Sequence, residues 1–181
     1  MLVERWKNGR PKFKGHSSEL EGMIRPVEDR EKWDRRFLSL AKEVSTWSKD
    51  PSTKCGAVLV NHRRQVVGMG YNGFPRGVWD RPDRYDDRET KYKMIVHAEV
   101  NALIHAGDKA RGATLYVYPS FMIPPICSEC AKVAIQCGIS AIVGFEPSPE
   151  AEERAKRWQE SILIARQMFT EANIQWRSYD E

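Results

Sequence analysis

The chain has 181 residues, of which 41% are apolar and 30% charged, and its formal net charge is +4. This length and composition predict one globular domain with a sizeable core. The longest apolar runs, such as residues 57–60, are too short to cross a bilayer, and the small charge excess does not by itself indicate nucleic-acid binding.

The first 30 residues differ from the rest of the chain. They are basic, lack a regular apolar period and contain several glycines and prolines. We therefore expect an irregular basic extension over residues 1–30 and a folded domain over residues 31–181. No signal-peptide type of apolar stretch precedes the domain, so we expect a cytoplasmic protein, in which a Cys-x-x-Cys pair is typical of metal-binding or redox sites.

The first half of the domain begins with a predicted helix. Between residues 31 and 49, apolar residues recur at spacings of four and three, which is the period of an amphipathic helix. Residues 55–60 and 65–70 are predicted to be the two strands of a β-hairpin. A polar stretch over residues 71–95 is predicted to be a long loop, a length that is usually functional or disordered.

The second half alternates helices and strands. The predicted helices are 97–106, 127–137 and 149–172, and the predicted strands are 113–118, 140–145 and 173–177. A second loop covers residues 119–126. This order of elements indicates a mixed sheet with helices on both faces.

Two cysteines stand at the start of the second of these helices. Cys127 and Cys130 are three residues apart, so both sulfurs lie on one face of the first helical turn. A helix N-terminus also favours thiolate over thiol, because its free N–H groups stabilise negative charge. The pair therefore provides half of a tetrahedral zinc site.

A histidine at another predicted helix start provides the third ligand. His97 directly follows an apolar segment, and three protein ligands leave one position of a zinc ion open for water, which is the catalytic arrangement. The other histidines, His16, His62 and His105, are weaker candidates for a fourth ligand. We interpret them as surface or packing residues.

Glu99 lies two residues after His97, where it can face the metal without binding it. Zinc lowers the pKa of a bound water, and a nearby carboxylate can take its proton and pass it on. The alternative is that Glu99 merely suits the positive end of a helix dipole. Together with the three ligands, however, the carboxylate indicates hydrolytic chemistry.

These residues resemble a known family. His97-Ala98-Glu99 followed by the Cys127–Cys130 pair is similar to the zinc-dependent deaminases of nucleobases and nucleotides. The resemblance is closer to the deoxycytidylate (dCMP) deaminases, and it runs from about residue 37 to residue 145. Its further motifs are Ser48-Lys49-Asp50-Pro51, Gly70-Tyr71-Asn72-Gly73, Thr90-Lys91-Tyr92 and Cys127-Ser128-Glu129-Cys130-Ala131-Lys132.

The resemblance implies a cytidine-deaminase-like three-layer α/β/α sandwich with a mixed five-stranded sheet. It implies Zn²⁺ as cofactor, with zinc-bound hydroxide attacking C4 of the cytosine of dCMP to give dUMP and ammonia. Glu99 would be the proton shuttle. The expected substrate contacts are Asn72, Ala98, Tyr71, Lys54 and Arg76, of which Lys54 and Arg76 are the preferred partners of the phosphate.

The family resemblance also implies partners. Its members are often homo-oligomers, and some respond to dCTP and dTTP together with Mg²⁺. We expect a small nucleotide substrate and no membrane partner. Nucleic acid is not expected, because the charges of the 71–95 loop nearly balance.

The sequence departs from the family pattern just before Cys127. Ile126 stands where the family usually has proline, and the 119–126 segment is a few residues longer than usual. Two alternatives therefore stay open beside dCMP deamination. One is a deaminase of another base or of a modified cytosine nucleotide, and the other is a binding or regulatory module with a structural zinc.

Overall fold

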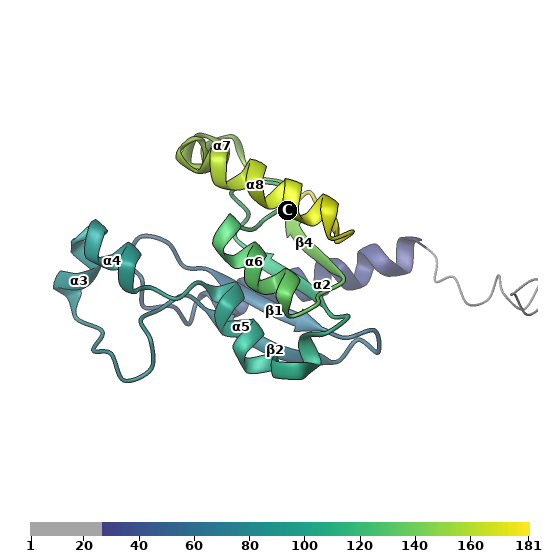
Figure 1. Cartoon of the computed structure of the whole chain (residues 1–181), viewed down its shortest axis with the longest axis horizontal. Coiled ribbons are helices and arrows are strands. Elements are labelled where there is room, and N and C mark those ends of the chain that lie inside the picture. Colours follow the sequence, from purple (N-terminus) through teal and green to yellow (C-terminus); the bar gives the residue numbers. More distant parts are fainter. Residues whose placement is uncertain (1–26) are drawn as a thin grey trace, which may run out of the picture. The chain divides into compact units, whose positions relative to one another are not determined.

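The computed structural model of the chain describes residues 27–181 (Figure 1). The chain divides into two compact units, Met1–Lys32 and Trp33–Glu181, and the second unit contains the whole sheet. The predicted irregular extension lies outside the described residues except for residues 27–30, which are helical, so the prediction is wrong for those four.

The described residues form helices and strands in the order α-β-β-α-α-α-β-α-β-α-α-β, with two short 3-10 turns. Their bounds are α2 Val27–Ser45, β1 Gly56–Val60, β2 Val66–Tyr71, α3 Pro82–Asp86, α4 Arg88–Met94, α5 Ala98–Ala106, η1 Gly107–Ala110, β3 Thr114–Tyr118, α6 Ser128–Gln136, β4 Ala141–Phe145, α7 Pro149–Ala155, η2 Lys156–Trp158, α8 Gln159–Glu171 and β5 Gln175–Tyr179. None of these helices is both long enough and apolar enough to cross a membrane.

The five strands form one mixed sheet in the order β2-β1-β3-β4-β5. β1 pairs antiparallel with β2 and with β3, whereas β3, β4 and β5 run parallel to one another. Every residue of β1 and of β4 is buried, as expected for strands that are covered on both faces.

Helices cover both faces of the sheet, and each face has its own apolar core (Figure 1). On one face, α5, α6 and α8 bury residues such as Leu103, Ala131 and Phe169. On the other face, Leu38 of α2 packs in a cluster with Val58 of the sheet. This arrangement confirms the predicted three-layer sandwich with a mixed five-stranded sheet.

Helix α5 lies very close to strand β2 because the strand presents glycines to it. A methyl group at Gly70 would lie 2.3 Å from the backbone nitrogen of Ala102 and 2.4 Å from the carbonyl oxygen of Ala98. Gly68 meets the same helix one turn later, where a methyl group would lie 2.5 Å from the carbonyl oxygen of Ala102. The absence of a side chain at Gly68 and at Gly70 therefore allows α5 to pack this close to β2.

The polar stretch 71–95 is not a structureless loop, and the prediction is wrong there. It contains α3, which begins at Pro82, and α4, whose first N–H groups donate hydrogen bonds to the side chain of Asp87. Neither helix has an apolar period that could predict it from the sequence, because α3 buries no residue and α4 buries only Lys91.

The predicted helix 149–172 is also broken. It consists of α7 and α8 with the 3-10 turn η2 between them, and the ring of Trp158 in that turn contacts the ring of Tyr92 on α4. The final strand begins two residues later than predicted, because Asn173 adopts a positive φ of 55° that ends the helix.

We expect Gly70→Ala to lower the free energy of unfolding by at least about 2 kcal/mol, because the new methyl group forces α5 away from the sheet. Gly73→Ala is the matched control, since a methyl group there has no atom within 4 Å. Its effect should stay below about 1 kcal/mol. Urea unfolding followed by circular dichroism measures both, and equal stabilities of the two variants would contradict the role assigned to Gly70.

Candidate metal centre

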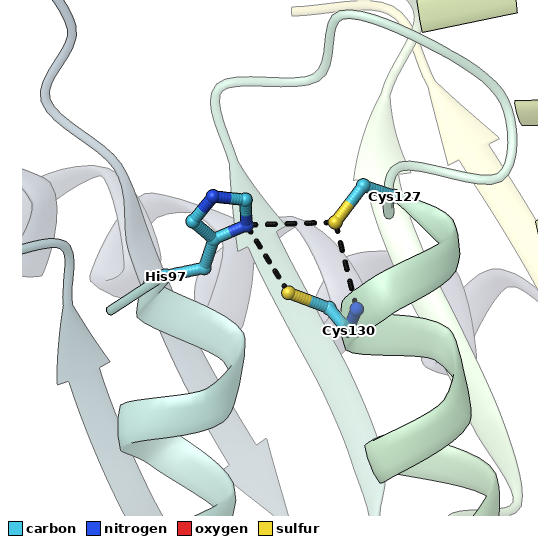
Figure 2. Close-up of side chains that lie close together, drawn as sticks. All are labelled: His97, Cys127 and Cys130. Atoms are coloured by element: carbon cyan, nitrogen blue, oxygen red, sulfur yellow. Dashed lines mark hydrogen bonds between the residues drawn. The ribbon is translucent and has the colours of Figure 1, made fainter. Parts of the chain in front are cut away.

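His97, Cys127 and Cys130 converge at the N-termini of two neighbouring helices (Figure 2). His97 is the N-cap residue of α5, Cys127 is the N-cap residue of α6, and Cys130 lies in the first turn of α6. The Nδ1 atom of His97 is 3.5 Å from Sγ of Cys127 and 3.2 Å from Sγ of Cys130. The sequence predicted this set of three, and the fold brings it together.

The three donor atoms fit one tetrahedral metal ion. All lie within 4.8 Å of one another. Ligand atoms bound to zinc at about 2.0–2.3 Å in a tetrahedron are roughly 3.3–3.8 Å apart, close to the observed separations. One imidazole and two thiolates are also a donor set that zinc prefers, and three ligands leave a coordination position for a fourth.

Electrostatics at this cluster favour negative charge on the sulfur of Cys127. Hydrogen bonds of Cys127 with Cys130 and with His97 lower the pKa of the Cys127 thiol to about 4, although burial opposes the shift. The hydrogen bond to Cys127 together with burial raises the pKa of Cys130, and the contact with Cys127 raises the pKa of His97 to about 9. Without a metal, His97 and Cys130 therefore keep their protons, and a bound cation would displace these protons.

Glu99 lies in the first turn of α5, two residues beyond His97, and lines the same cavity as His97 and Cys127. Its side chain is buried, and burial raises the pKa of the carboxyl above its ordinary value while the nearby His97 opposes the shift. A carboxyl held in this way exchanges protons more readily near neutral pH than an exposed glutamate does.

The cavity above these residues has a volume of about 550 Å³. It is walled by the segment after α2, the 72–99 region, the segment before α6 and the turn η2. A volume of this size falls within the usual range for small-molecule sites. Residues on its wall from the unusual 119–126 segment are Pro119, Phe121, Met122, Pro125 and Ile126.

The predicted substrate contacts are only partly brought together. Asn72 and Ala98 line the cavity, whereas Tyr71, Lys54 and Arg76 do not. The ring of Tyr71 packs against Trp47 outside the cavity. Lys54 instead lines a second cavity of about 410 Å³, and Arg76 is exposed.

Asn72 is part of the framework of the cavity wall. Its side-chain oxygen accepts a hydrogen bond from the backbone N–H of Cys55, and its amide nitrogen donates to the carbonyl of Thr53 and to Asp50. These bonds tie the end of β2 to the segment that precedes β1.

A buried ion pair on the same wall was not found from the sequence. Lys91 of α4 lies 2.8 Å from the carboxylate of Asp50, with side-chain exposures of 8% and 2%. Ser52 and Thr53 also donate hydrogen bonds to Asp50. Burial favours a higher pKa for Asp50, but the hydrogen bonds from Lys91 and Ser52 outweigh it and hold the pKa below its ordinary value.

Of the remaining histidines, His62 and His105 lie outside the cluster. His105 hydrogen bonds with the backbone of Met69 on β2, and His62 is exposed in the hairpin turn. His16 lies outside the described residues. In the part of the chain that the structure describes, His97 is therefore the histidine available to the two cysteines.

Comparison with known proteins assigns this arrangement to a family. The model of the cytidine and deoxycytidylate deaminase zinc-binding region matches residues 31–146. A deaminase of Aliivibrio fischeri from the luxG 3′ region, described as uncharacterized, is 40% identical over 146 residues, which make up 80% of this chain and 91% of that protein. Human deoxycytidylate deaminase is 31% identical over 153 residues, covering 81% of this chain and 79% of the human protein.

A solved structure has the same fold. The dCMP deaminase of cyanophage S-TIM5, in complex with dCMP and dUMP, superimposes with a TM-score of 0.59 at 20% identity, over 86% of this chain and 99% of that chain. This likeness confirms the expected cytidine-deaminase-like fold. The zinc-binding description of the family model, together with the His97, Cys127 and Cys130 cluster, supports Zn²⁺ as the cofactor.

We expect Lys91→Met to lower the free energy of unfolding at pH 7 by about 3–5 kcal/mol, because it leaves a buried carboxylate without its partner. Lys93→Met removes the same charge from the same helix, but its pair with Glu89 is exposed, so the expected loss is below about 1 kcal/mol. Denaturant unfolding of the wild type and of the two variants measures these losses in free energy.

The difference between the wild type and Lys91→Met should shrink in acid. The pKa of Asp50 is lowered in the folded state, so its contribution is present above the ordinary aspartate value of about 4 and is lost as the pH falls through the folded value. A difference that stays constant down to pH 2 would exclude Asp50 as the partner that matters.

Zinc content tests the ligand set. We expect about one zinc per wild-type chain and less than roughly one tenth of that after Cys130→Ser, because the weaker hydroxyl ligand replaces a thiolate. Cys137→Ser is the control, since Cys137 ends α6 outside the cluster and should leave zinc unchanged. Mass spectrometry of the purified proteins provides the measurement, and full zinc retention by the Cys130 variant would refute the assignment.

Proposed function

The chain belongs to the cytidine and deoxycytidylate deaminase family, and from this membership we propose that it hydrolyses dCMP to dUMP and ammonia. The observation that carries the proposal is the presence of Glu99 in one cavity with His97 and Cys127. The names of relatives such as human deoxycytidylate deaminase support dCMP as the substrate. We assign the reaction to pyrimidine nucleotide metabolism in the cytoplasm.

In this proposal His97, Cys127 and Cys130 hold Zn²⁺. Zinc held by these three residues would lower the pKa of a water molecule toward ~7 and so supply a nucleophile at neutral pH. The lowered pKa of Cys127 at the N-terminus of α6 favours the thiolate form of this sulfur, and Cys130, whose pKa is raised, would give up its proton to a bound metal.

Glu99 moves the protons. Addition of the water oxygen to C4 of cytosine needs a proton on N3, and departure of the amine needs a second proton on its nitrogen. Glu99 accepts protons from the attacking water and delivers them first to N3 and then to the leaving amine, so that ammonia departs and a C4 carbonyl remains. Its raised pKa suits both steps.

The wall of the cavity orients the nucleotide. Asn72 and Ala98 are the proposed contacts that line it. Asn72 already holds the 53–55 segment through its side-chain amide, so its main contribution is to fix the shape of the wall. Tyr71, Lys54 and Arg76 lack support as substrate contacts because they do not line the cavity.

Assembly and regulation stay predictions of the family resemblance. They are a homo-oligomer and a response to dCTP and dTTP with Mg²⁺. The choice between dCMP and another substrate, such as a modified cytosine nucleotide, involves the 119–126 segment. Two of its residues, Phe121 and Met122, line the cavity.

Ammonia release from dCMP tests the function. We expect Glu99→Gln to lower kcat at least about 100-fold while zinc is retained, because the amide cannot carry a proton. Glu129→Gln is the matched control: Glu129 is exposed, pairs with Lys132 and lies beside the cysteines, so its kcat should stay within about twofold.

A screen over dCMP, CMP, 5-substituted dCMP, cytidine, guanine and adenine separates the alternatives. A strong preference for another substrate would replace dCMP in the proposal. A zinc-loaded wild type that is inactive on all six would support the structural-zinc module instead.

A further inference from the structure

Two arginines lie at the open side of the active-site cavity. Arg88 is the first residue of α4, and Arg157 is in the 3-10 turn η2, about 70 residues later in the chain. Both side chains line the cavity that holds His97 and Glu99, and both residues are exposed. Because they are exposed and also line the cavity, they lie at its mouth.

Two aromatic rings connect these arginines. The rings of Tyr92 and Trp158 meet edge to face with centroids 6.1 Å apart at 72°. The guanidinium of Arg88 lies 5.3 Å from the centroid of Tyr92, and Nε of Arg88 donates a 3.2 Å hydrogen bond to the Tyr92 hydroxyl. The guanidinium of Arg157 lies 5.7 Å from the centroid of Trp158. We call these four side chains the mouth cluster.

The charges of the mouth cluster are not neutralised by carboxylates. Within residues 27–181, neither Arg88 nor Arg157 forms an ion pair, whereas their neighbours Lys93 and Lys156 pair with Glu89 and Glu153.

The third cation that lines the cavity, Lys91, is buried and already forms an ion pair with Asp50. The two arginines are thus the cations of the cavity that remain free for a ligand.

We propose that Arg88 and Arg157 form the phosphate subsite of this cavity, and that they determine the preference for a nucleotide over a nucleoside. This proposal rests on the proposed function and names the residues that recognise the phosphate of its substrate. A phosphate dianion matches two planar guanidinium groups, each of which offers paired N–H donors. If the base lies against the metal cluster and Glu99, as the proposed function requires, the phosphate at the other end of the nucleotide lies toward the mouth.

Half of this subsite comes from outside the region that the family model matches. Arg157 and Trp158 lie beyond residue 146, where that match ends. The aromatic contact between Tyr92 and Trp158 brings the turn η2 to α4 and holds both guanidinium groups on one side of the cavity. The C-terminal part of the chain therefore contributes to specificity as well as to the core.

The test compares kcat/KM for dCMP and for deoxycytidine in Arg88→Ala, in Arg157→Ala and in the double variant. Each single change should lower kcat/KM for dCMP roughly 10- to 100-fold, as expected for the loss of a hydrogen-bonded charge contact, and leave deoxycytidine within about twofold. The matched control is the double variant Lys93→Ala and Lys156→Ala. It removes the same total charge from the same two elements, but outside the cavity, and should keep the preference for dCMP.

Calorimetry measures the affinities for dUMP and for deoxyuridine, and so tests the phosphate subsite independently of turnover. If the arginine variants keep both the preference for dCMP and the affinity for dUMP, the subsite is wrong while the function stands. If the wild type releases no ammonia from dCMP, yet binds dUMP more tightly than deoxyuridine through both arginines, the proposed function fails and the subsite stands. A wild type without activity and without dUMP binding overturns both proposals.

Discussion

The close approach of two helix N-termini on one face of the sheet is the constraint on which the site depends. Helix α5 can lie against β2 because Gly68 and Gly70 present no side chain to it, and the helix in turn presents Ala98 and Ala102. Small residues of α6 pack in the same core. Two helix starts thus meet where His97 and the cysteines stand, and their unpaired N–H groups favour the negative charge that the ligand set needs.

Buried charge recurs around this meeting point. Glu99 is buried beside the metal cluster, and Lys91 is buried against Asp50 elsewhere in the lining of the same cavity. An isolated buried charge is costly, so Lys91 and Asp50 pair with each other, whereas burial raises the pKa of Glu99 and so favours its neutral form. The hydrogen bonds of Asp50 with Ser52 and with Lys91 join the segment before β1 to α4. The buried ionisable residues of this region are therefore also residues that line the cavity.

The cavity is closed by elements that lie far apart in the sequence. Its floor comes from the starts of α5 and α6, one wall from α4, another from the 119–126 segment, and part of its mouth from η2. Trp158 stands in the 3-10 turn between α7 and α8, where its ring contacts Tyr92 of α4 and lines the cavity. The entrance combines Arg88 and Tyr92 from the matched region with Arg157 and Trp158 from beyond it, whereas His97, Glu99 and the two cysteines all lie within the match.

The sequence by itself determined the elements and residues whose signals are local. Apolar periods predicted α2, the β1–β2 hairpin and the strands, while the spacing of Cys127 and Cys130 and the position of Glu99 beside His97 predicted the metal cluster and the shuttle. Only the tertiary structure decided that the charged helix α4 buries Lys91, that Lys54 and Arg76 stay out of the cavity, and that Arg88 meets Arg157 across two aromatic rings. The spacing of two metal ligands is set within one helical turn, so a local pattern shows it. Whether a charged side chain is buried, and which residue it pairs with, depends on segments far away in the sequence, so a local pattern does not show it.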